Sequence, residues 1–207
     1  MLRATDESPR LFANELLDRL SRTHWIVVPL LWLPVSALML VYGVWVAHAG
    51  IVAPLGFAAF GFVFWTLVEY WLHRTFFHWT PGGTWGARMH LLVHGVHHDW
   101  PHDKYRLVMP PAVSVSLCFL LLVPFYAVFG SRWVWSWYGG FGMGYVFYDC
   151  CHYWLHHSNP KTAYFARLKK NHMLHHFDDD GSRFGVSTMI WDRVFGTVGA
   201  RTFTSRR

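Results

Sequence analysis

Long apolar segments without a charged side chain dominate the pattern of this chain. From Trp25 to Val68 no residue is charged, and this length is about twice the roughly 20 residues that a helix needs to cross a bilayer. Gly50 and Pro54 lie near its middle and favour a tight turn between two antiparallel helices. The segment therefore predicts two membrane spans.

Two further apolar segments follow. Residues 107–131 are uncharged, and another segment begins at Trp133 with the small residues of 139–144, which allow helices to approach closely. A soluble helical core is the alternative, but its helices rarely stay uncharged over about 25 residues. We predict an all-α integral membrane protein that forms one domain over residues 1–207. Its predicted parts are an interfacial amphipathic segment at 1–24, four transmembrane spans at about 25–48, 51–72, 107–131 and 133–152, and cytoplasmic histidine-rich regions at 73–106 and 152–207, which would form a helical cap.

The charged residues support this topology and give it a direction. Only 14% of the residues are charged and 53% are apolar, and the net charge is +6. Of the 18 Lys and Arg residues, only Arg132 lies between the third and fourth predicted spans; the others lie on the opposite side of the predicted topology. By the positive-inside rule, both termini and the histidine clusters are expected in the cytoplasm.

Other compositional features narrow the class of protein. No Lys/Arg-rich run is interleaved with polar residues, so a nucleic-acid partner is not expected. Cys118, Cys150 and Cys151 fall in apolar stretches and are expected to be buried rather than disulfide-bonded or zinc-bound. Lysine is scarce beside arginine, and the C-terminal residues 204–207 show no retrieval signal of the Lys-Asp-Glu-Leu type. These two features favour a bacterial inner membrane over the endoplasmic reticulum.

Histidine is the residue type that indicates chemistry in this chain. There are 15 histidines, and most of them lie in the two predicted cytoplasmic regions. Four groups stand out: His73 and His78; His94, His97 and His98; His152 and His156; and His172, His175 and His176.

The spacing within these groups predicts shared faces. Helix positions i, i+3 and i+4 point along one face, so each triplet would converge on a common centre. His73 and His78 lie roughly 140° apart on an ideal helix, and they share a face only if the helix ends or bends between them. Neutral imidazole suits iron, zinc, copper or nickel. Ten such ligands exceed what one ion accepts, so two ions are expected.

Other kinds of site match this pattern less well. A transporter would place its ligands near the bilayer midplane on broken helices, and a structural zinc site typically uses four ligands, often Cys. Redox chemistry on a membrane substrate fits better. The spacing leaves the roles of His90 and His157 open, because each lies beside a predicted ligand group. The remaining three histidines, His24, His48 and His102, are expected at the interface or in loops.

Beyond its histidines, the chain resembles the fatty acid hydroxylase family of membrane di-metal oxygenases. The resemblance covers about residues 65–199 and is closest to the fatty acid and sphingolipid 2-hydroxylases. Spaced histidines alone are shared with desaturases, sterol oxidases and carotenoid hydroxylases. Three further stretches carry the narrower resemblance: residues 103–111, 144–149 and 184–196.

The resemblance implies a reaction and a cofactor. It implies dioxygen-dependent hydroxylation of a lipid acyl chain, at the 2 position of a long-chain fatty acid or an N-acyl sphingolipid. Two metal ions are implied, iron in the active enzyme, and zinc is an alternative ion because imidazole sites accept it readily. The implied ligands are His73, His78, His94, His97, His98, His152, His156, His172, His175 and His176.

Partners and rival functions follow from the same resemblance. Eukaryotic family members often carry a haem-binding cytochrome domain for which this chain has no room. A separate electron donor is therefore expected, either a cytochrome b-type protein or a ferredoxin with its reductase. A sterol methyl oxidase or a carotenoid hydroxylase of the same superfamily is the nearest alternative. A non-catalytic zinc-binding membrane protein or transporter is the alternative from another class.

Two carboxylates lie on the faces of predicted ligands. Asp149 precedes His152 by three residues, and Glu69 precedes His73 by four. Either could accept the second ring N–H of a metal-bound histidine and so fix its tautomer. The aromatic-rich segments 62–71 and 145–154 are candidates to line a pocket for the lipid tail, although ordinary helix packing explains them equally well.

Overall fold

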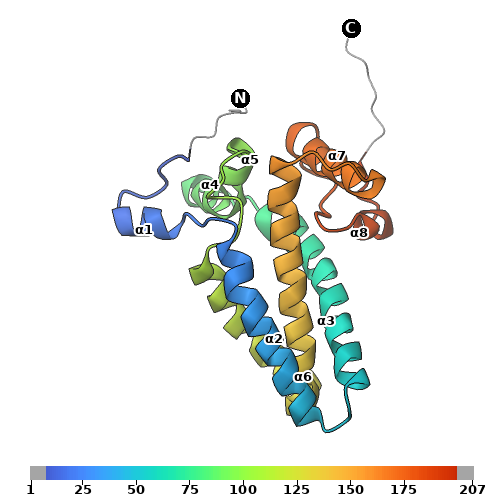
Figure 1. Ribbon diagram of the computed structural model, residues 1–207. Coiled ribbons are helices and arrows are strands. Elements are labelled where there is room, and N and C mark those ends of the chain that lie inside the picture. Colours follow the sequence, from blue (N-terminus) through green and yellow to red (C-terminus); the bar gives the residue numbers. More distant parts are fainter. Residues whose placement is uncertain (1–7, 200–207) are drawn as a thin grey trace.

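The computed structural model describes residues 8–199, which form helices and loops without a β-strand. The long helices lie side by side, and the shorter helices gather at one end of them (Figure 1). The predicted all-α class is therefore confirmed for the described residues. In chain order the elements are α1 (Glu15–Leu20), α2 (Val27–Ala47), α3 (Val52–Trp71), the π-helix η1 (Leu72–Phe77), α4 (Gly83–His90), the π-helix η2 (Leu91–Gly95), α5 (Val96–Asp99), α6 (Pro111–His157), α7 (Ala163–Phe177) and α8 (Ile190–Val194).

Among residues 8–199, three continuous helical segments are long and apolar enough to cross a membrane. They are Val27–Ala47, Val52–Phe77 and Pro111–His157. The first two match the predicted spans at 25–48 and 51–72, and the turn between them falls at His48 and Gly50, which both have positive φ angles. The third segment covers both remaining predicted spans.

The long helix α6 folds back on itself at Gly130. This residue has a φ of 63° and a ψ of 175°, a left-handed conformation that glycine adopts most easily. The ring centroids of Phe125 and Trp137 lie 4.2 Å apart, and the Tyr138 hydroxyl donates to the carbonyl of Cys118 at 2.6 Å. In a straight helix, Phe125 and Trp137 would lie about 18 Å apart along the axis, and Cys118 and Tyr138 about 30 Å apart. The two limbs of α6 therefore lie antiparallel and in contact.

Small residues let the long helices pack closely. A Cβ atom at Gly140 would collide with the backbone of Ala58 in α3, and one at Gly61 would collide with the backbone of Trp137. A Cβ atom at Gly139 would lie 2.8 Å from the carbonyl oxygen of Ser36 in α2. The close approach predicted from the 139–144 series is confirmed.

The long helices are apolar on their outer faces as well as in the core between them. Leu30 in α2, Val52 in α3 and Leu120 in α6 are 70%, 81% and 70% exposed. Such exposure over several helices would be unfavourable in water, but it is expected where lipid is the solvent.

The segment before α2 contains less helix than the predicted amphipathic segment at 1–24. Residues 1–7 lie outside the described part of the chain, and α1 is its one helix among residues 8–24. Leu16 and Leu20 are exposed, whereas Asp18 is buried. The Asp18 carboxylate forms ion pairs of 2.9 Å with Arg22 and Arg106. These pairs join the N-terminal segment to the loop before α6.

Candidate metal centre

The ten histidines of the four groups meet at one end of the long helices, where they form two clusters. Within each cluster, one potential ligand atom from every residue lies within 4.8 Å of the others. We call the two clusters site A and site B. Site A contains His73, His78, His94, His98 and His175, and site B contains His97, His152, His156, His172 and His176.

Each histidine triplet is divided between the two sites. His94 contributes to site A together with His98, whereas His97 contributes to site B. The second triplet has the reverse arrangement: His172 and His176 belong to site B, and His175 to site A. The expectation that each triplet converges on one centre was therefore wrong. Positions i+3 and i+4 lie about 100° apart around a helix axis, on opposite sides of position i, and this angle separates the two sites.

A π-helix brings His73 and His78 together. Their ring centroids are 5.1 Å apart, although an ideal α-helix would separate them widely. In a π-helix the hydrogen bonds run from i to i+5, so residues five apart share a face. The helix also ends at His78, which is the C-cap of η1. Both the local widening and the helix end contribute to the shared face that the spacing required.

The five remaining histidines lie outside both clusters. His90 directly precedes the second π-helix, η2, which contains His94, and the centroid of the His90 ring lies 6.4 Å from that of His78. His157 stacks on Tyr153 with a centroid distance of 4.2 Å. The ring of His24 lies beside that of Trp25. His90 and His157 are thus set apart from the two five-histidine clusters.

Two rings of site A are oriented by backbone carbonyls. His73 Nδ1 lies 2.6 Å from the carbonyl oxygen of Phe184, and His175 Nδ1 lies 2.7 Å from that of Ser182. A carbonyl oxygen only accepts, so Nδ1 carries the proton in both rings. The Nε2 atoms of both rings then have a free lone pair and face the other site A rings. The Nε2 atoms of His73 and His94, for example, lie 3.1 Å apart.

The rings of site B have fewer polar partners. Within residues 8–199, every site B ring has at least one buried nitrogen without a hydrogen-bond partner, and no site A ring does. For His152 and His176 this applies to both nitrogens. Unpartnered buried nitrogens are costly, and one potential ligand atom from each of these five rings lies within 4.8 Å of the others, which fits a bound cation. The two sites thus share a ligand type but differ in their surroundings.

Burial keeps the histidines neutral at physiological pH. Burial and the neighbouring imidazoles lower the pKa of His78 to about 3 and that of His98 to about 2. The same two causes hold the pKa values of His94, His97 and His172 well below the usual range. Neutral imidazole is the form that binds a metal ion, so the donor set fits two ions of the iron or zinc type.

Neither predicted carboxylate accepts a hydrogen bond from a histidine ring among the described residues. Asp149 accepts from the backbone N–H of Met109 at 3.1 Å. Glu69, which is 2% exposed, accepts from the backbone N–H groups of Val186 and Ser187 at 2.8 and 2.7 Å and from the Ser187 hydroxyl. Both carboxylates therefore anchor loops rather than rings.

The ring acceptors of site A could not be identified from the sequence. They are main-chain carbonyls of Ser182 and Phe184, and any residue type supplies such an atom. Asp192 was also missed as a functional candidate. It accepts from the N–H groups of Phe184 and Gly185 at 2.8 and 3.0 Å. Its position in the 184–196 stretch was the one available signal.

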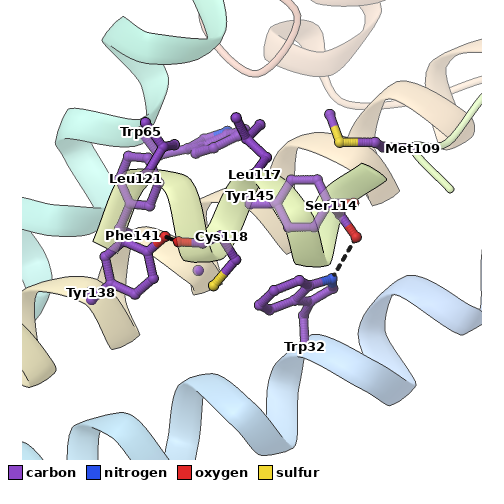
Figure 2. A pocket seen from close by; sticks show the side chains of 11 residues that line it. Trp32, Trp65, Met109, Ser114, Leu117, Cys118, Leu121, Tyr138, Phe141 and Tyr145 are labelled. Carbon is purple, nitrogen blue, oxygen red and sulfur yellow. Dashed lines mark hydrogen bonds between the residues drawn. The ribbon is translucent and has the colours of Figure 1, made fainter. Parts of the chain in front are cut away.

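An apolar slot lies between the long helices below site B. Figure 2 shows Trp32, Trp65 and Tyr145 around it, with the Trp32 indole N–H donating to the Ser114 hydroxyl at 3.1 Å. The ring of Tyr148 connects the slot to site B, because it lies 5.9 Å from the Trp65 ring and 5.8 Å from the His152 ring. Site B is therefore one aromatic ring away from an apolar space inside the helix bundle.

Site A faces a different environment. A hollow of about 420 Å³ lies beside it, lined by His78 and His98 together with the polar side chains of His90, Asp99 and Asp180. Ala87, Leu91 and Gly95 also line this hollow, so its surface is both polar and apolar, whereas the surface of the slot near site B is apolar.

Known proteins are similar in sequence to this chain over most of its length. A dihydroceramide fatty acyl 2-hydroxylase of Arabidopsis thaliana is 39% identical, and the match covers 93% of this chain and 81% of that protein. A ceramide very long chain fatty acid hydroxylase of Saccharomyces cerevisiae is 42% identical over 92% of this chain and 49% of its own length. The chain thus spans about half the length of this yeast relative.

Structural and family comparisons give the same result. The solved structure of full-length scs7p, in which only the hydroxylase domain is visible, aligns with a TM-score of 0.84 and 38% identity. The alignment covers 91% of this chain and 71% of that one. The family model for fatty acid hydroxylases matches residues 58–197. This protein therefore belongs to the fatty acid hydroxylase family.

Proposed function

We propose that this protein is a membrane hydroxylase that inserts one oxygen atom at carbon 2 of a lipid acyl chain. The substrate is an N-acyl sphingolipid or a long-chain fatty acid, in line with the relatives named for ceramide and dihydroceramide acyl chains. The observation that carries the proposal is the pair of five-histidine sites beside an apolar slot. The net reaction consumes the acyl chain, dioxygen, two electrons and two protons, and it yields the 2-hydroxyacyl chain and water.

The ten clustered histidines would hold the two metal ions, with iron in the active enzyme. When bound, these ions supply the redox chemistry that activates dioxygen. The chain itself holds the ligands in their neutral form through burial and orients two rings of site A through carbonyls. A donor set without a carboxylate also accepts zinc, so the metal found after purification will depend on the preparation.

The apolar slot, about 40 Å³ in volume, would receive the part of the acyl tail nearest the metal centre. A lipid carbonyl sits near the membrane interface, so carbon 2 lies just beneath it and within reach of a centre at the ends of the spans. The slot begins one ring from site B and continues between α2, α3 and both limbs of α6. This geometry would place one methylene near the metals and exclude water from the tail.

We place four spans across the membrane: α2, α3 with η1, and the two limbs of α6. The apolar outer faces and the fold-back at Gly130 support this count. Arg132 lies at the end opposite to the metal centre and donates to the Ala47 carbonyl at 3.0 Å. Because the other basic residues among 8–199 lie at the metal end, we place that end and its helical cap in the cytoplasm.

Two parts of the proposal concern the cellular setting. The relatives described above come from a plant and a yeast, which favours the endoplasmic reticulum and gives no support to the preference for a bacterial membrane. The C-terminal residues behind part of that preference lie outside the described residues. Electrons would come from a cytochrome b-type protein or from a ferredoxin with its reductase.

The test is mass spectrometry of total fatty acids, after hydrolysis, from cells that express the protein with a reductase system. We expect long-chain acids that have gained one oxygen atom at carbon 2, and none from the His94→Ala variant. A wild-type protein that contains iron and receives electrons but forms no such acid would contradict the proposal. Oxidised sterols or carotenoids in those cells would then assign the protein to the alternative functions.

A further inference from the structure

The loop that follows α7 touches site A through its backbone. Residues 182–187 supply the two carbonyl oxygens, from Ser182 and Phe184, that accept the Nδ1–H groups of His175 and His73. These rings come from different helices, α7 and η1. One short loop thus sets the orientation of two site A ligands at once.

Two buried carboxylates hold this loop in place. Glu69 on α3 accepts from Val186 N, Ser187 N and the Ser187 hydroxyl. Asp192 on α8, which is 1% exposed, accepts from the N–H groups of Phe184 and Gly185. Four consecutive backbone N–H groups of the loop are therefore bound by side-chain carboxylates.

The loop has little freedom to move within this clamp. A Cβ atom at Gly185 would collide with the Thr188 carbonyl and lie 2.9 Å from the Asp192 carboxylate. The Asp192 carboxylate also accepts from the Thr197 hydroxyl at 2.9 Å. The position of the Phe184 carbonyl is thus determined from both sides of the loop.

We propose that Glu69 and Asp192 are positioning residues for site A, which they serve by fixing the 182–187 loop, and that site A for this reason retains its metal ion longer than site B. The inference rests on the proposed function in that it requires the two sites to bind metal. Groups that orient a metal-binding histidine typically change metal affinity by about 10- to 100-fold when they are removed. In site B, four of the five rings have no acceptor for Nδ1 among residues 8–199: those of His152, His156, His172 and His176.

The experiment measures release of zinc from the loaded full-length protein in detergent to a chromogenic chelator. His156→Ala removes a site B ligand and leaves site A complete, whereas His98→Ala removes a site A ligand and leaves site B complete. We expect Glu69→Ala to accelerate release by about 10- to 100-fold in the His156→Ala background. In the His98→Ala background Glu69→Ala should leave the release rate unchanged.

Asp149→Ala is the matched control for this experiment. Asp149 is also a buried carboxylate near the metal end of a long helix, with 1% exposure, but it anchors Met109 rather than the 182–187 loop. It should not alter release from site A. Glu69→Gln keeps one oxygen that can accept from both amides, so it should restore most of the slow release.

The outcomes separate this inference from the proposed function. Equal release rates with and without Glu69→Ala in the His156→Ala background would overturn the inference, and so would equal acceleration in both backgrounds. A protein that binds no metal at all would contradict the proposed function itself. The inference is supported if acceleration is confined to site A and the glutamine variant reverses it.

Discussion

Sites A and B are built from the same ligand, five histidines each, yet their surroundings differ. Site A borders a hollow lined by polar and apolar side chains, and two of its rings are held by backbone carbonyls. Site B is buried throughout, has unpartnered ring nitrogens, and adjoins the apolar slot through Tyr148. The comparison teaches that ligand identity alone does not define a metal site. Here the two sites differ in the hydrogen-bond partners of their rings and in the cavities beside them.

The largest effect is expected when two adjacent histidines of one triplet, His97 and His98, are substituted one at a time. His97→Ala removes a site B ligand and His98→Ala a site A ligand, so each should reduce the metal content from two ions to about one and lower hydroxylation at least about 100-fold. Metal analysis after brief chelation should find the remaining ion retained in His97→Ala and lost from His98→Ala. Loss of the same ion from both variants would mean that the triplet serves a single centre.

The next largest effect is expected at the apolar slot near site B. Leu121 lines the slot, and the adjacent Leu120 is 70% exposed on the outer face. Leu121→Trp should overfill the slot, at a cost of about 1–3 kcal/mol, and lower turnover of the longest acyl chains roughly tenfold relative to short ones. Leu120→Trp is the control and should leave the product profile unchanged. Identical chain-length profiles in both variants, read by mass spectrometry, would exclude the slot as the tail site.

A smaller effect is expected from a substitution at Gly140, which should shift site B relative to site A. Gly140 packs against the α3 backbone at Ala58, and α3 leads to His73 of site A, whereas the limb of α6 that contains Gly140 leads to His152 of site B. Gly140→Ala should lower the free energy of unfolding by about 1–3 kcal/mol and reduce metal retention at site B. Gly56→Ala has open space around it and should do neither. Thermal unfolding and metal analysis of the pair provide the check, and an unchanged melting temperature for Gly140→Ala would contradict the packing.

The smallest effect is expected at the boundary of site A. His90 lines the hollow beside site A but does not belong to either cluster. His90→Ala should therefore keep both ions and change their release rates by less than about threefold, well below the effect of removing an orienting group. Loss of one ion from this variant, measured by elemental analysis, would mean that site A extends to His90.

Much of the fold was predictable because lipid imposes a simple rule on sequence. Uncharged segments longer than about 20 residues must form helices that satisfy their own backbone groups, and α2, α3 and both limbs of α6 fall where such segments lie. The ten clustered histidines were also predictable, since their spacing repeats and imidazole has few other uses in such numbers. The assignment to the fatty acid hydroxylase family was confirmed.

The division of these histidines between two sites could not be predicted. It depends on the rotation of about 100° around the helix axis between positions i+3 and i+4. It also depends on where the partner helices lie, which cannot be read from the spacing of the histidines. The π-helix that pairs His73 with His78 has no reliable sequence signal. The acceptors at Ser182 and Phe184 are main-chain atoms, which sequence cannot distinguish. Glu69 was therefore expected to accept from the His73 ring, whereas it binds the loop whose carbonyl orients that ring.

The most direct test of the account is oxygen-isotope labelling with the purified, iron-loaded protein, a reductant system and a defined N-acyl sphingolipid. The account predicts that dioxygen labelled with heavy oxygen leaves one labelled atom at carbon 2 of the acyl chain, in a product that His97→Ala and His98→Ala both fail to form. A hydroxyl derived from water, a hydroxyl at another carbon, or unchanged product from either variant would contradict it.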